Sequence, residues 1–85
     1  MELKEQFEAA VTNSKSLAQK PANDVLLKLY SLYKQGTEGN VSTEAPSNPF
    51  DFVARAKHDA WVELKGTTKE TAMQQYVDLV TSLKG

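Results

Sequence analysis

The sequence has 85 residues, of which 40% are hydrophobic and 25% are charged, and its formal net charge at pH 7 is −1. This length predicts a single domain over residues 1–85, and the composition is typical of a globular chain rather than a disordered one. The chain has no cysteine, which excludes disulfides and thiolate chemistry, and its small net charge gives no general attraction to nucleic acid or anionic lipid.

The first expected element is an amphipathic helix that ends before Pro21. Its apolar residues recur at three-to-four spacing, which is the pattern of one buried stripe: Leu3, Phe7, Ala10, Val11, Leu17 and Ala18. The pair Lys20-Pro21 ends the helix, because proline disfavours the helical conformation in the residue before it.

A second helix is expected from Asn23, with the Asn23 side chain as its N-cap and Asp24 in its first turn. The helix should end around Gly36 to Gly39, where glycines interrupt the periodicity. Its apolar positions are Val25, Leu26, Leu29, Tyr30, Leu32 and Tyr33.

Residues 39–49 are rich in proline, serine, glycine and asparagine, which predicts a long loop. A third helix should begin near Asp51 and end at Gly66, with periodic Phe52, Val53, Ala56, Ala60, Trp61 and Leu64. A fourth helix should follow, since Thr67 and Glu70 have the spacing of a capping box. No strand alternation is found, so the predicted fold class is all-α with four helices.

Helical wheels place two lysines where the core should be. At about 100° per residue, one group of the second helix is expected to be its solvated face: Asp24, Lys28, Ser31 and Gln35. Lys34 instead falls between Tyr30 and Leu27, inside the apolar arc. Lys57 lies within the apolar arc of the third helix in the same way, and Lys15 lies at the margin of the first stripe.

Two interpretations of these lysines stay open from the residues alone. A lysine within an apolar arc can bury its methylenes while its ammonium reaches water, and this fits any one of them. Two such lysines, each beside an aromatic residue, favour a pocket for a ligand with an aromatic ring and several phosphates. By position alone Tyr76 indicates core, and four more large residues are expected to pack: Phe7, Phe52, Trp61 and Met73.

Three segments occur in an order and spacing that closely resemble the acyl-CoA-binding protein family: YSLYKQGTEGN, FVARAKHDAW and ELKGTTKETAMQQY. FEAAVTNSKSL and KPAND also fit, so the resemblance covers nearly the whole chain. It implies an up-down-down-up four-helix bundle that binds and carries long-chain acyl-CoA thioesters without catalysis.

The resemblance also implies a set of ligand-binding residues. Four positions match residues that hold the adenine and the ribose 3′-phosphate of CoA: Tyr30, Tyr33, Lys34 and Lys57. Lys15 matches a lysine that reaches the head group, and Tyr76 matches a contact near the ribose and pantetheine. The acyl chain is expected in an apolar groove formed partly by the first and second helices, with Val11 and Leu27 in its wall. The sequence departs from many members at His58, where tryptophan is common, and at Ala45, where arginine is common.

Two rival functions were weighed. An enzyme would have to use His58, the single histidine, but no nucleophile or metal-ligand set can be paired with it, and a surface histidine is the simpler interpretation. A helical protein-interaction module would explain the apolar stripes but not the lysines within them. We therefore expect no catalytic residue, metal or cofactor.

The expected setting is a cytoplasmic monomer that does not bind nucleic acid. The first residues carry charges among their apolar positions and do not form a signal-peptide core. No apolar run approaches the ~20 residues of a membrane span, so no stable membrane insertion is expected.

Overall fold

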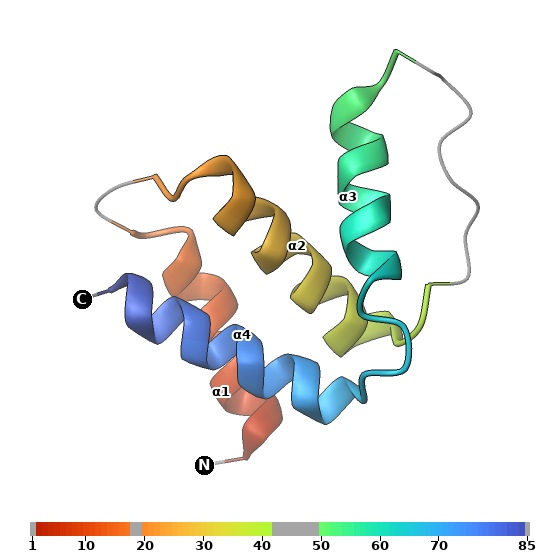
Figure 1. The fold of residues 1–85 in the computed structure, drawn as a ribbon. Helices are drawn as coiled ribbons and strands as arrows, with labels where there is room; N and C mark the ends of the chain where they lie inside the picture. Colours follow the sequence, from red (N-terminus) through yellow and green to blue (C-terminus); the bar gives the residue numbers. More distant parts are fainter. Residues whose placement is uncertain (1, 18–19, 42–49, 85) are drawn as a thin grey trace.

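The computed structural model describes residues 2–17, 20–41 and 50–84, and the regular structure in these ranges is helical (Figure 1). It consists of α1 (Leu3–Ser14), α2 (Asn23–Glu38), α3 (Phe52–Val62) and α4 (Lys69–Leu83). These elements confirm the predicted all-α fold class within the described ranges. Most of the predicted loop, with Ala45 in it, lies outside the described residues, as does Ala18 of the first predicted stripe.

Helix α1 is shorter than the sequence predicts. It ends at Ser14 rather than near Lys20. The backbone N–H of Lys15 bonds to the carbonyl of Thr12, which is the tighter three-residue spacing that often closes a helix. The Ser14 hydroxyl also donates to the carbonyl of Val11 at 2.7 Å, so side-chain and backbone donors compete for the last turn.

Two predicted caps are wrong by one residue. The N-cap of α2 is Ala22, which offers no side-chain bond, and Asn23 is already helical. The N-cap of α4 is Thr68 rather than Thr67, and its hydroxyl accepts a bond from the Thr71 N–H at 3.1 Å. The α3 N-cap is Asp51, where the sequence indicated the start of that helix, and its carboxylate accepts from the Ala54 N–H.

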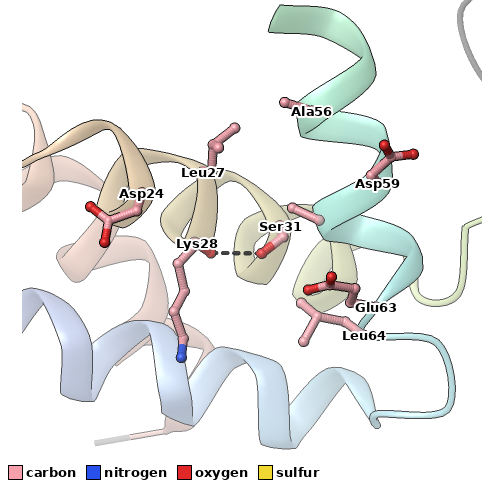
Figure 2. Close-up of a pocket in the computed structure, with 9 residues that line it drawn as sticks. Asp24, Leu27, Lys28, Ser31, Ala56, Asp59, Glu63 and Leu64 are labelled. Atoms are coloured by element: carbon pink, nitrogen blue, oxygen red, sulfur yellow. Dashed lines mark hydrogen bonds between the residues drawn. The ribbon is translucent and has the colours of Figure 1, made fainter. Parts of the chain in front are cut away.

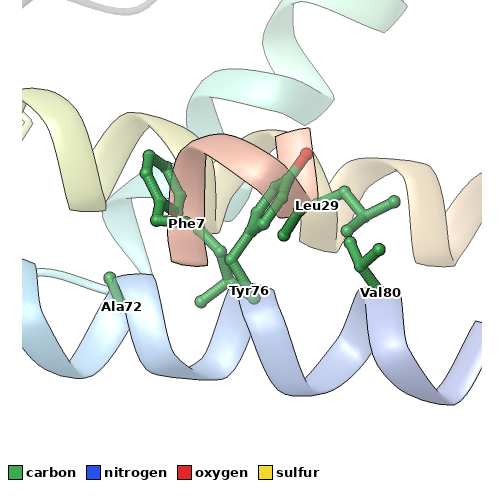
Figure 3. Packing of buried hydrophobic residues seen from close by; sticks show 7 residues of the cluster. Phe7, Leu29, Ala72, Tyr76 and Val80 are labelled. Atoms are coloured by element: carbon green, nitrogen blue, oxygen red, sulfur yellow. The ribbon is translucent and has the colours of Figure 1, made fainter. Parts of the chain in front are cut away.

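The hydrophobic core is built by three helices. Helix α2 packs against both α3 and α4, and α1 packs against α4 (Figure 1). Figure 3 shows the side chains of α1, α2 and α4 meeting. The buried cluster consists of Phe7, Ala10, Leu29, Leu32, Ala72, Tyr76 and Val80. Helix α3 contributes no member to this cluster.

The start of the apolar stripe predicted for α3 is open to solvent, while the rest is partly or fully buried. Trp61 is 4% exposed, but Phe52 is 72% exposed and Val53 is 65% exposed. The prediction that Phe52 packs in the core is therefore wrong. The physical reason is that, among the described helices, α3 packs against α2 alone, so these helices cover the N-terminal half of its stripe from one side. This arrangement leaves an apolar surface beside α2.

The difference in burial between Phe7 and Phe52 can be tested by measuring the stability of variants at the two positions. Phe7→Ala should lower the free energy of unfolding by about 3–5 kcal/mol, because it empties a buried site. Phe52→Ala should change it by no more than about 0.5 kcal/mol, as for other exposed side chains. Urea unfolding followed by far-UV circular dichroism measures both. A loss for Phe52→Ala as large as that for Phe7→Ala would show that α3 belongs to the core.

Candidate functional site

One arc of α2 carries most of the predicted site residues. At about 100° per residue, five side chains fall within about 120° of the helix circumference: Tyr33, Leu26, Tyr30, Lys34 and Leu27. The core residues Leu29 and Leu32 lie on another side, toward the buried cluster. The arc therefore faces away from the core and is free to build a surface between α1 and α3.

Where α2 faces α3, one lysine of each helix lies over an aromatic ring of the other helix. The Lys57 ammonium of α3 is 5.3 Å from the centre of the Tyr30 ring of α2. The Lys34 ammonium of α2 is 5.2 Å from the centre of the Trp61 ring of α3. Each contact is within the range of a cation–π interaction. The structure thus brings together three predicted site residues, together with Trp61, which the sequence analysis assigned to packing.

Lys34 also forms an ion pair within α2. Its ammonium donates to the Glu38 carboxylate one turn later, and the two side chains are 27% and 52% exposed, respectively. This hydrogen bond raises the pKa of Lys34 above its ordinary value, against a smaller opposing effect of burial. Lys34 is therefore cationic at neutral pH.

Tyr33 lies toward α1 rather than beside Lys57. Its ring stacks on Phe7 with centres 5.9 Å apart and an interplanar angle of 23°, and it remains 41% exposed. Tyr33, Phe7 and Val11 line one groove of about 450 Å³ between α1, α2 and α4, with Lys4 and Lys69 among its other lining residues. This groove offers an aromatic face beside ammonium groups.

A second groove, of about 340 Å³, separates α2 from the open end of α3. Its lining is mainly apolar and consists of Asn23, Leu26, Leu27, Phe52, Val53, Ala56 and Lys57. Leu27 lines this groove, while Val11 lines the groove on the α1 side. A shared acyl-chain wall for these two residues stays a prediction. Val53 and Leu26 were not among the predicted ligand-binding residues, because a helical wheel does not show whether an apolar stripe is left uncovered.

The remaining predicted residues, Lys15 and Tyr76, occupy different settings. Lys15 is exposed at the C-cap of α1. Tyr76 is 4% exposed; its hydroxyl donates to the Ser14 hydroxyl at 3.1 Å, and its ring meets Phe7 edge-on. Position alone indicated a core residue, and the burial of Tyr76 agrees with that. A ligand-binding role for Tyr76 stays a prediction.

A third groove lies on the other side of the α2–α3 junction and has a different charge (Figure 2). It encloses about 540 Å³ and is lined by the acidic side chains Asp24, Asp59 and Glu63, with a single lysine, Lys28. Figure 2 shows Asp24 and Lys28 on α2, Asp59 on α3 and Glu63 just after the end of α3. Three carboxylates against one ammonium repel a polyanion, so a phosphate ligand is favoured on the Lys34–Lys57 side.

A buried amide network fastens the C-terminal end of α2 to the turn between α3 and α4. The Gln35 side chain is 0% exposed, and its Nε2 donates to the Thr67 carbonyl at 2.6 Å and to Asn40 Oδ1 at 3.0 Å. Asn40 Oδ1 also accepts from the Gly66 N–H at 2.8 Å. The Trp61 indole N–H donates to the Gly39 carbonyl at 2.9 Å. These bonds hold Trp61, and with it α3, beside Lys34.

The predicted solvated face of α2 is partly wrong. Gln35 is 0% exposed and Ser31 is 3% exposed, while Asp24 and Lys28 of the same sector are exposed. All four residues lie in the same sector of the helical wheel, but Asp24 and Lys28 belong to the N-terminal half of α2 and Ser31 and Gln35 to its C-terminal half. The C-terminal half of α2 lies against the α3–α4 turn through the Gln35 bonds, and its N-terminal half does not.

His58 is not the surface residue that the sequence suggested. Its side chain is 15% exposed, and Nδ1 lies 3.9 Å from Asp59 Oδ1. In the ranges that the structure covers, no group of three or more histidine, aspartate or glutamate side chains could hold a metal ion.

The fold and the site define a small helical ligand-binding domain, and comparison with known proteins identifies its family. Residues 4–80 match the family described as acyl CoA binding protein. The chain is 47% identical over 77 residues to Acyl-CoA-binding protein homolog 1 of Caenorhabditis elegans, covering 91% of this chain and 88% of that protein. The Acyl-CoA-binding protein of Dictyostelium discoideum is also 47% identical over 77 residues, with 91% and 90% covered. The chain belongs to the acyl-CoA-binding protein family.

Longer proteins match as well. Enoyl-CoA delta isomerase 2 of Rattus norvegicus is 53% identical over 77 residues, and the matched part is 91% of this chain but 19% of that protein. The chain thus spans about a fifth of the length of this relative.

Solved structures confirm the predicted four-helix fold. The crystal structure of Oryza sativa Acyl-CoA-Binding Protein 2 superposes with a TM-score of 0.90 at 40% identity, covering 96% of this chain and 90% of that one. The crystal structure of ACBP from Moniliophthora perniciosa gives a TM-score of 0.88 at 38% identity, covering 98% of this chain and 80% of that one.

The Gln35 network yields a stability prediction. Gln35→Leu keeps the bulk of the side chain but removes the donors to Thr67 and Asn40, so it should lower the free energy of unfolding by about 1–3 kcal/mol. Gln75→Leu on the exposed side of α4 is the control and should change it by no more than about 0.5 kcal/mol. Chemical denaturation measures both, and equal effects would contradict the proposed importance of the buried amide.

Proposed function

We propose that this protein binds one long-chain acyl-CoA thioester and carries it without chemical change. The observation that supports this most is the row of features along one arc of α2. Tyr33 lines an aromatic groove toward α1, Lys34 and Lys57 each lie over an aromatic ring between α2 and α3, and Leu27 lines an apolar groove toward α3. An acyl-CoA has an adenine ring, phosphates and an alkyl chain, which suit an aromatic surface, cations and an apolar groove, respectively.

The middle of the arc suits the phosphate-bearing part of the ligand. Lys34 and Lys57 each present an ammonium beside an aromatic face, so a phosphate there gains charge-assisted hydrogen bonds. The adenine would stack on the exposed faces of Tyr30 or Tyr33. Lys15, exposed after the last turn of α1, would reach the same head group.

The groove between α2 and α3 suits the acyl chain. Phe52 and Val53 are exposed apolar side chains that a chain would cover, and Leu26 and Leu27 form the opposite wall. Each methylene removed from water contributes about 0.8 kcal/mol, so a long chain gains more than a short one until it outgrows the groove. This assigns the acyl wall to α2 and α3, with Leu27 in it and Val11 on the head-group side.

Carriage without catalysis accords with the family, which is named for binding. Among the described residues no helix is long and apolar enough to cross a membrane. We propose a monomeric carrier in the cytoplasm, with acyl-CoA as its partner and no bound cofactor. Incubation with palmitoyl-CoA should leave the thioester intact, and its hydrolysis would contradict the carrier role.

Calorimetry with palmitoyl-CoA tests the proposal. The unmutated protein should bind close to one ligand per chain with a negative heat-capacity change, because binding buries the acyl chain. Lys57→Met keeps the methylenes and removes the charge, and it should weaken binding by about 1–2 kcal/mol.

Lys28→Met is the matched control, since it removes the same charge from the acidic groove on the other side of the α2–α3 junction. Lys28→Met should change the binding free energy of palmitoyl-CoA by no more than about 0.5 kcal/mol. Equal losses for both variants would mean that only net charge matters, and the absence of binding by the unmutated protein would refute the function.

A further inference from the structure

The ammonium that the proposed function assigns to phosphate already has an anionic partner. Lys34 donates to the Glu38 carboxylate, and both groups are partly open to solvent, at 27% and 52% exposure of their side chains. The same ammonium lies 5.2 Å from the centre of the Trp61 ring. A phosphate that approaches Lys34 from solvent therefore meets a carboxylate one helical turn away.

Glu38 is poorly placed to stabilise α2. It is the last residue of the helix, where the backbone dipole is negative and a carboxylate is unfavourable. The pair also has lysine before glutamate, which is the weaker order for ion pairs four residues apart on a helix. An exposed pair of this kind contributes little to folding. Helix stability therefore does not account for a carboxylate at this position.

The carboxylate does affect the binding of an anion at Lys34. A phosphate must either displace Glu38 from the ammonium or share the ammonium with it, and in both cases two anions lie near each other. Glu38 could also help, by holding Lys34 over Trp61 before the ligand arrives. The repulsion should dominate, because a weak exposed pair orders its lysine only slightly while like charges at contact distance repel strongly.

We propose that Glu38 limits the affinity of the site, as a built-in counter-ion that competes with the ligand phosphate for Lys34. This inference rests on the proposed function. Glu38 lowers the affinity for any phosphate at Lys34 by a similar factor. A long-chain thioester still binds, because its alkyl chain gains binding energy in the apolar groove between α2 and α3.

The variant Glu38→Gln tests this role, because it keeps the shape of the side chain and removes its charge. Calorimetry should show palmitoyl-CoA binding about 3–10-fold tighter than to the unmutated protein. Palmitoyl-dephospho-CoA, which lacks the ribose 3′-phosphate, should gain less than about 2-fold. The melting temperature should stay the same or rise, because the variant removes a carboxylate from the negative end of α2.

Glu63→Gln is the matched control. It changes the net charge equally but lies in the acidic groove, away from the two cation–aromatic contacts. It should alter palmitoyl-CoA affinity by less than about 2-fold. An equal gain from Glu63→Gln would reduce the effect to net charge and overturn the proposal.

Two other results separate this inference from the function on which it rests. If the unmutated protein binds palmitoyl-CoA and Glu38→Gln leaves the affinity unchanged or weakens it, Glu38 does not compete and the inference is wrong while the carrier function stands. If no variant binds palmitoyl-CoA, the proposed function is wrong, and the role of Glu38 is lost with it.

Discussion

The placement of α3 beside the three-helix core depends on one buried amide, that of Gln35. Its Nε2 donates to the Thr67 carbonyl and to Asn40 Oδ1, which also accepts from the Gly66 N–H. A buried amide donor without partners is costly, so these bonds fix the α3–α4 turn against the C-terminal end of α2. Helix α3 has no part in the three-helix hydrophobic cluster, and this turn, with the Trp61 indole bond to Gly39, is what positions it.

This arrangement explains why the protein can have a stable core and an open binding face at once. The core lies among α1, α2 and α4, where Phe7 and Leu32 are buried. Helix α3 stands beside α2 with Phe52 and Val53 exposed, so an apolar groove stays open without loss of core packing. The polar network therefore holds the C-terminal end of α3 near α2 and places Trp61 under the Lys34 ammonium.

The sequence could predict the helices and the anomalous lysines, because both follow from periodicity along one helix. Lys34 and Lys57 do lie over aromatic rings, but the rings belong to the opposite helix: Trp61 for Lys34 and Tyr30 for Lys57, whereas the wheels placed Tyr30 beside Lys34 and Trp61 beside Lys57. What covers each face depends on contacts between distant segments, which a wheel does not contain. Gln35 was therefore assigned to solvent, although it is buried and donates to the Thr67 carbonyl 32 positions away. Phe52 was assigned to packing, although it is 72% exposed.

The most direct test of the account is to map the ligand on the protein by NMR. Backbone amide shifts should be recorded while palmitoyl-CoA is added to the unmutated protein. The account predicts the largest changes along the α2 arc and the facing side of α3, at Leu27, Tyr30, Lys34, Val53 and Lys57. Largest changes instead around Asp59 and Glu63, with this arc unaffected, would place the ligand in the acidic groove and contradict it.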